Sequence, residues 1–339
     1  FLTNRPQEVS FSGSRSVIGQ LLSGVPQGSV LFPLLFLAYT AELFSIIARH
    51  GFKAHSYADD TQIYMSAPAN SAPDAARRFS DCVADVNTWM NRNRLKLNTD
   101  KTQIIWVGSR QQLAKLVSTD VTLGSTTVGS STTVVDLGFH LDNHLTMTAH
   151  VAHLSRSCYF QLRQLRSVRR SLSTDATISL IHAFVSSRLD YCNSLLYKIS
   201  DGLLVKLQRI QNAAARLVTG VRRWEHITPV LRRLHWLPVR SRIVFKIATV
   251  VYKCLHGLAP LYLARHCIPL TEVHGRGHLR SAAAHKLSEP RTHTKLAGSR
   301  LFSVCGPVVW NGLPERLRNH GLSLNAFRRE LKTELFKEL

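Results

Sequence analysis

The sequence predicts an α+β fold, with short strands concentrated in the first 140 residues and helices in the remainder. Short apolar segments separated by turn residues recur as far as about Val135, which is typical of antiparallel hairpins. From about Thr148 onward, apolar residues recur at helical spacing. At 339 residues the chain can bury a substantial core, and this length predicts two or three domains.

The net charge indicates a polyanionic partner. Lys and Arg number 43 and Asp and Glu number 21, giving a formal charge of +22. Such an excess favours nucleic acid as the partner. A membrane surface is the alternative, but neither terminus is a basic amphipathic segment, so we expect no membrane partner. The apolar content of 45% is ordinary for a globular protein and excludes wholesale disorder.

The six cysteines are widely spaced and form no CxxC pair, which favours a reduced, intracellular protein in the nucleus or cytoplasm over a zinc protein. Four histidines lie close together in the sequence. Metal ligation and a partly exposed basic segment are both open interpretations of this group, and short motifs of this kind often arise by chance. The four are His140, His144, His150 and His153.

The first elements lead up to a helix. Residues 1–18 alternate loosely in polarity, as a hairpin would. Residues 23–31 contain two glycines and a proline and predict a loop feeding a helix. The apolar run over 30–48 approaches the length of a membrane span, but Pro33 and Glu42 interrupt it. We therefore predict a buried helix there.

Residues 55–64 are the stretch around which the rest is organised. Asp59 and Asp60 lie between two short apolar segments, which predicts a tight hairpin with both carboxylates at its tip. Carboxylate oxygens are hard ligands that suit Mg²⁺. A solvated turn is the alternative explanation for an isolated Asp-Asp pair.

The segments that follow continue the mixed pattern. Residues 73–90 have apolar side chains at helical spacing and predict a helix with one core face. Residues 95–98 and 104–107 predict strands on either side of a turn that carries Lys101. Residues 124–135 are rich in Ser, Thr and Gly and predict a further hairpin.

The second half predicts amphipathic helices, including one over 324–339. Leu203, Leu207 and Ile210 share one helical face, with Arg209 and Arg216 opposite. Each basic face alone is explained by solvation, but together with the net charge they predict a nucleic-acid groove. A second basic patch consists of Arg163, Arg166, Arg169 and Arg170.

Several blocks, in this order, resemble the reverse transcriptases of LINE-type (non-LTR) retrotransposons. The resemblance covers nearly the whole chain, and its specificity lies in the order and spacing of the blocks. They are residues 24–29 (Gly-Val-Pro-Gln-Gly-Ser), 57–60 (Tyr-Ala-Asp-Asp), 98–102, 137–138 (Leu-Gly), 187–193 (Ser-Arg-Leu-Asp-Tyr-Cys-Asn), 235–238 (His-Trp-Leu-Pro), 306–307 and 310–311.

The resemblance implies a partial polymerase palm with an antiparallel sheet, followed by a helical thumb and C-terminal region. The corresponding divisions are residues 1–140 for fingers and palm, 141–225 for the thumb-like region and 226–339 for the C-terminal helices. It further implies an RNA template, a DNA primer and deoxynucleotides as partners.

The resemblance also implies the catalytic residues. Asp59 and Asp60 correspond to the paired carboxylates that hold Mg²⁺ in the palm, where two ions serve nucleotidyl transfer. Lys101 matches a family lysine that would protonate the departing pyrophosphate, although a turn lysine is the alternative.

The remaining implied site residues contact substrate. Gln27 and Gly28 would lie against template and incoming nucleotide, and Tyr57 would lie beside the substrate. Leu137 and Gly138 would belong to the primer grip.

Two departures from the family pattern qualify these expectations. Phe32 stands where the family has glycine, and no aspartate precedes Asp59, although the family needs one upstream. We therefore expect a truncated reverse transcriptase that is inactive as this chain. A non-catalytic nucleic-acid-binding protein and a relic open reading frame are the alternatives.

Overall fold

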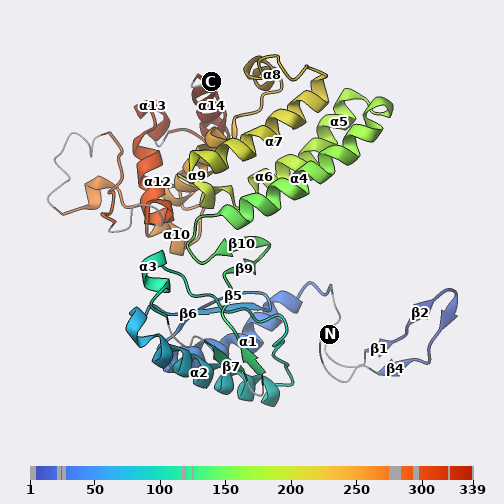
Figure 1. Ribbon diagram of the computed structural model, residues 1–339, viewed down its shortest axis with the longest axis vertical. Coiled ribbons are helices and arrows are strands. Elements are labelled where there is room, and N and C mark those ends of the chain that lie inside the picture. Colours follow the sequence, from blue (N-terminus) through green and yellow to red (C-terminus); the bar gives the residue numbers. More distant parts are fainter. Residues whose placement is uncertain are drawn as a thin grey trace. The chain divides into compact units, whose positions relative to one another are not determined.

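The computed structural model describes residues 5–20, 24, 28–116, 120–123, 126–274, 284–292, 298–319 and 321–337. Figure 1 shows its helices and strands in chain order. The chain divides into two compact units, Phe1–Ser131 and Thr132–Leu339. Helices and small antiparallel sheets occur together, so the predicted α+β class is confirmed. The division at residues 140 and 225 refers to family domains and stays a prediction.

The strands of the described residues pair into five separate two-stranded antiparallel ribbons, rather than into one larger sheet. The N-terminal hairpin is confirmed. The strands predicted over 95–98 and 104–107 are wrong, since only Ile104 forms a bridge, with Ser130. The ribbons are β1 (Pro6–Gln7) with β4 (Gly19–Gln20), β2 (Ser10–Phe11) with β3 (Ser14–Arg15), β5 (Lys53–Tyr57) with β6 (Asp60–Tyr64), β7 (Val121–Leu123) with β8 (Thr126–Val128), and β9 (Thr133–Asp136) with β10 (Phe139–Asp142).

Helix α1 (Phe32–Arg49) forms where a helix was predicted, but the prediction that it is buried is wrong. Only Leu43, Ile46 and Ile47 are buried, because the apolar residues of α1 that enter the hydrophobic core of the first unit lie in its C-terminal half. Leu34 is 66% exposed and Leu37 is 50% exposed. By length and composition alone, α1 is apolar enough to cross a membrane.

The first unit is held together by α1 and α2 (Ala72–Arg92), which pack around the β5–β6 ribbon. The predicted core face of α2 is confirmed, with Cys82, Val86 and Trp89 buried. The Trp89 indole Nε1 donates a hydrogen bond of 2.8 Å to Glu42 of α1, so the polar group on this apolar face has a partner. A short helix, α3 (Arg110–Leu113), follows in the same unit.

The second unit is helical, with one hydrophobic core that runs from Phe139 to Leu335. Helices α4 and α7 lie side by side in it (Figure 1). The predicted apolar face of α7 is buried, as is one face of the predicted C-terminal helix, α14. Its helices are α4 (Thr148–Val168), α5 (Thr174–Ile181), α6 (Ser187–Asp190), α7 (Asp201–Thr219), α8 (Thr228–Arg233), α9 (Val239–Leu255), α10 (Leu261–Ala264), α12 (Phe302–Asn311), α13 (Glu315–Arg318) and α14 (Leu324–Lys337).

Arg169, predicted as part of a nucleic-acid patch, is used inside the fold. Its guanidinium donates to the backbone carbonyls of Leu217, Val218 and Leu172, each at 3.0 Å. Carbonyls at the end of a helix lack intrahelical partners, and Arg169 satisfies two of them at the end of α7. Arg163, also in that patch, remains exposed on α4.

Asp142, at the end of β10, fixes the start of α4. Its carboxylate accepts hydrogen bonds from the backbone N–H groups of Thr146 and Met147, each at 2.8 Å, and from the Thr146 hydroxyl at 3.1 Å. Asp142 is itself buried, so these donors replace its lost hydration. Met147 is thereby held at a left-handed φ of 67° immediately before the helix.

Replacing Asp142 with alanine should lower the free energy of unfolding by about 2–3 kcal/mol, because two backbone donors lose a charged acceptor. Asp142→Asn keeps one carbonyl oxygen and should cost about half as much. Urea unfolding followed by circular dichroism measures both changes. Equal stability of wild type and Asp142→Ala would contradict this role.

Candidate functional site

The hairpin predicted around the two aspartates is present as the β5–β6 ribbon. Tyr57 pairs with Asp60, which leaves Ala58 and Asp59 as a two-residue loop. Such short loops need left-handed backbone, and Ala58 supplies it with a φ of 54°. A residue with a Cβ is strained in this conformation, so the flanking strands must impose it.

The two faces of the ribbon have different surroundings, because successive side chains of a strand point to opposite sides. Ala54 and Ile63 form a facing pair and pack against the core of α1 and α2. Tyr57 and Asp60 form another facing pair on the other side, where Tyr57 is 70% exposed. The packed face therefore anchors the ribbon and leaves the Tyr57–Asp60 face open to solvent.

Asp59 and Asp60 are both exposed. Within the described residues, neither carboxylate takes part in an ion pair. Neighbouring carboxylates repel each other, and a bound cation relieves that repulsion. The described part of the chain contains no cluster of three or more His, Cys, Asp or Glu side chains arranged to hold a metal ion. The two exposed carboxylates are of the kind that could contribute to a divalent-ion site.

Within the described residues, no hydrogen bond or ion pair links Gly28 or Lys101, two of the other predicted residues of the first unit, to this tip. Gln27 lies outside the described residues. Gly28 has a φ of 85°, a left-handed conformation that favours glycine. Lys101 lies in an exposed turn, where its backbone N–H donates to Asn98 Oδ1 at 3.2 Å.

Leu137 and Gly138, predicted as a primer grip, form the loop of the β9–β10 hairpin in the second unit. Their φ values are 45° and 79°, so both central residues are left-handed, as in a type I′ turn. The Tyr191 hydroxyl donates to the Leu137 carbonyl at 2.5 Å. Tyr191 belongs to the block over 187–193, so the structure connects two blocks that are far apart in the sequence.

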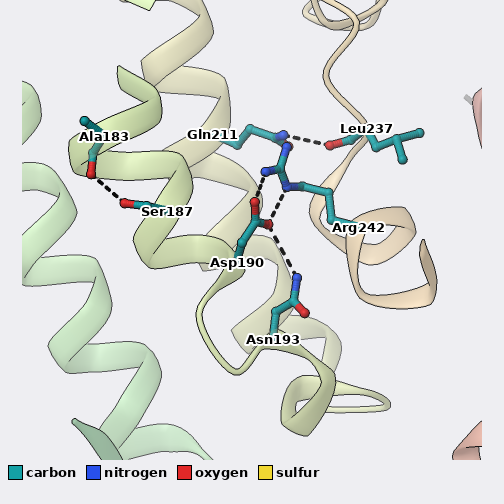
Figure 2. A network of polar contacts seen from close by, with 7 residues as sticks. All are labelled: Ala183, Ser187, Asp190, Asn193, Gln211, Leu237 and Arg242. Carbon is teal, nitrogen blue, oxygen red and sulfur yellow. Dashed lines mark hydrogen bonds and ion pairs between the residues drawn. The ribbon is translucent and has the colours of Figure 1, made fainter. Parts of the chain in front are cut away.

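A network of polar contacts joins the block over 187–193 to the segment after residue 234 (Figure 2). Asp190 binds the Arg242 guanidinium through two bonds, one of them 2.7 Å from Nε. Asn193 Nδ2 donates to the same carboxylate at 3.4 Å. Gln211 Nε2 donates to the Leu237 carbonyl at 2.7 Å. Sequence reasoning missed this network, because no spacing rule relates Asp190 to a partner 52 positions away.

The histidine cluster is a packed group in which three rings lie near one another. The His140 and His153 ring centroids are 4.1 Å apart, and His150 stacks on Phe139 at 3.8 Å. The described residues contain no group of three or more His, Cys, Asp or Glu side chains arranged to hold a metal ion, so they give no support to metal ligation by these histidines. Burial, followed by the nearby His140 and His153, lowers the pKa of His150 to about 4.

This pKa makes the protein less stable in acid. The unfolded chain protonates His150 near its ordinary pKa of about 6.5, whereas the folded chain resists protonation down to about 4. The contribution of neutral His150 to the free energy of unfolding is therefore fully present above pH 6.5, and it is lost as the pH falls from 6.5 toward 4. Urea unfolding over this range should show the fall, and His150→Asn should reduce it. An unchanged pH dependence in that variant would contradict the assignment.

Comparison with known proteins identifies a family and several relatives that this chain is similar to. Residues 11–141 match the family described as reverse transcriptase (RNA-dependent DNA polymerase). This range contains all the residues predicted from the sequence to form the site. Three relatives come from Drosophila melanogaster. The probable RNA-directed DNA polymerase from transposon BS is 29% identical over 72% of this chain, the one from transposon X-element is 25% identical over 65%, and the polymerase from mobile element jockey is 22% identical over 65%.

The chain spans about a quarter of the length of these relatives, 27% for the BS protein and 24% for the other two. No solved structure matches the chain.

Proposed function

Residues 11–141 belong to the reverse transcriptase family, and from this premise we propose that the chain is part of an RNA-directed DNA polymerase of a non-LTR retrotransposon. The predicted relationship to LINE-type reverse transcriptases is confirmed by the family match and the transposon relatives. Because the chain spans about a quarter of those relatives, its own activity and partners are proposals.

The observation that carries the proposal is the tip of the β5–β6 ribbon. Asp59 and Asp60 are adjacent and exposed beside Tyr57, and within the described residues neither carboxylate takes part in an ion pair. Mg²⁺ in nucleotide-transferring enzymes is held by one or two carboxylates together with water and substrate phosphates. The pair thus supplies the kind of ligand that the ion prefers.

The donor set does not complete a two-ion site. No aspartate precedes Asp59 in the sequence, and the described residues offer no third ligand at the tip. We therefore propose that this chain holds one part of the metal site and does not extend a primer by itself. A further carboxylate would have to come from outside these residues.

The other predicted residues keep substrate-binding roles in the proposal. Gln27 and Gly28 would contact template and nucleotide, Lys101 would serve the departing pyrophosphate, and Leu137 and Gly138 would contact the primer. Gly28 and Gly138 are compatible with this, because glycine carries no side chain that would keep a ligand away from the backbone.

A second candidate is nucleic-acid binding without catalysis. It is favoured by the charge of +22 and by exposed arginines on α4, a helix whose sequence contains no acidic residue. Binding of this kind releases counterions, so its affinity falls steeply as salt rises. It is compatible with descent from a polymerase.

Primer extension on an RNA template with Mg²⁺ separates these candidates. The wild-type chain should give no more extension than Asp59→Asn, because neither has a complete donor set. Both should bind the template–primer with a strong dependence on salt.

If the wild-type chain extends the primer and Asp59→Asn does not, the proposal that the metal site is incomplete would be contradicted. Absence of binding at low salt would contradict the nucleic-acid function itself.

A further inference from the structure

An open cavity of about 610 Å³ lies in the second unit, where α9 and α14 meet the end of the block over 187–193. Five of the residues that line it are Lys or Arg, and Asp190 is the one carboxylate among its described lining residues. The five are Arg242 and Lys246 on α9, and Arg328, Arg329 and Lys332 on α14.

The spacing of these residues gathers positive charge on two facing helices. Arg242 and Lys246 are four apart on α9, as are Arg328 and Lys332 on α14, so each pair shares a helix face. Like charges at this spacing repel. Asp190 is already bound by Arg242, which leaves four cations in the cavity without a carboxylate among its lining residues.

Parts of the cluster are held in place before any ligand arrives. Asp190 holds the Arg242 guanidinium by two bonds (Figure 2), and only 19% of the Arg242 side chain is exposed. The Arg328 guanidinium lies over the Phe245 ring, 5.9 Å from its centroid. Such anchoring reduces the entropy lost when a ligand binds.

Lys332 is the most confined of the lysines in the cavity. It is partly buried, and burial together with the charge of Arg242 lowers its pKa. An anion in the cavity would replace the hydration that Lys332 has lost and would offset the repulsion from Arg242. The cavity is therefore electrostatically suited to an anion.

We propose that this cavity binds a backbone phosphate of a nucleic acid strand. Guanidinium groups match phosphate oxygens in pairs, and ammonium groups add charge. Lys246, Arg328 and Arg329 are exposed, so a strand running over the surface can reach them. The inference rests on the proposed nucleic-acid function and assigns that function a definite contact site.

The test compares two double variants of the full chain that lose the same charges. Lys246→Gln with Arg329→Gln removes one lysine and one arginine from the cavity. Lys337→Gln with Arg265→Gln removes one of each from exposed positions outside it. All four positions are surface sites, and matching urea midpoints would establish that both variants fold.

Binding of a labelled single-stranded oligoribonucleotide is measured between about 50 and 200 mM salt. The cavity variant should bind about 10-fold more weakly than wild type, and its salt slope should fall by about one phosphate contact. The control should keep the wild-type slope. An equal loss in both variants would overturn the proposal, because it would reflect net charge alone.

Inorganic phosphate serves as a second probe, followed through the unfolding temperature of each protein. Phosphate should stabilise wild type and control but not the cavity variant. If wild type is stabilised by phosphate but binds no oligonucleotide, the assignment to nucleic acid is overturned together with the proposed function. Wild type could instead bind the oligonucleotide while phosphate stabilises all three proteins equally, or stabilises none of them. Either result would overturn the assignment of the phosphate contact to the cavity, and the proposed function would stand.

Discussion

The β5–β6 ribbon depends on its contact with helices α1 and α2, since a two-stranded ribbon alone is at best marginally stable in water. Ala54 and Ile63 provide that contact by packing against the core around Ile47 and Trp89. The alternation of the strands then directs the opposite face to solvent. Packing of apolar residues on one side thus determines that the Asp60 carboxylate is exposed on the other.

The same dependence on tertiary contacts governs the second unit. Side chains of the block over 187–193 hold other segments of this unit. Tyr191 donates to the Leu137 carbonyl of another block, and Asp190 binds Arg242 of α9. Tyr191 and Asp190 stabilise the fold directly, so their presence in a family block has a structural explanation. The Asp190–Arg242 pair lines part of the cationic cavity, and the two bonds to Asp190 fix the orientation of the Arg242 guanidinium there.

Local pattern was enough to predict part of this structure. A polar pair between apolar segments predicts the Asp59–Asp60 hairpin, and helical spacing predicts the buried faces of α2 and α7. Patterns fail where the partner of a residue is distant in the chain. Arg169 resembles any exposed arginine in sequence, yet it satisfies carbonyls 48 and 49 positions away. The exposed half of α1 differs from prediction because composition cannot specify which elements pack against it.

We propose that the chain presents two carboxylates of a metal site but not a complete one. Titration of Mn²⁺ into the full chain, followed by electron paramagnetic resonance, tests it most directly, with Asp59→Asn/Asp60→Asn as the control. One weakly bound ion, lost in the double variant, is the predicted result. Two tightly bound ions in the wild-type chain, or binding that persists in the double variant, would contradict the claim.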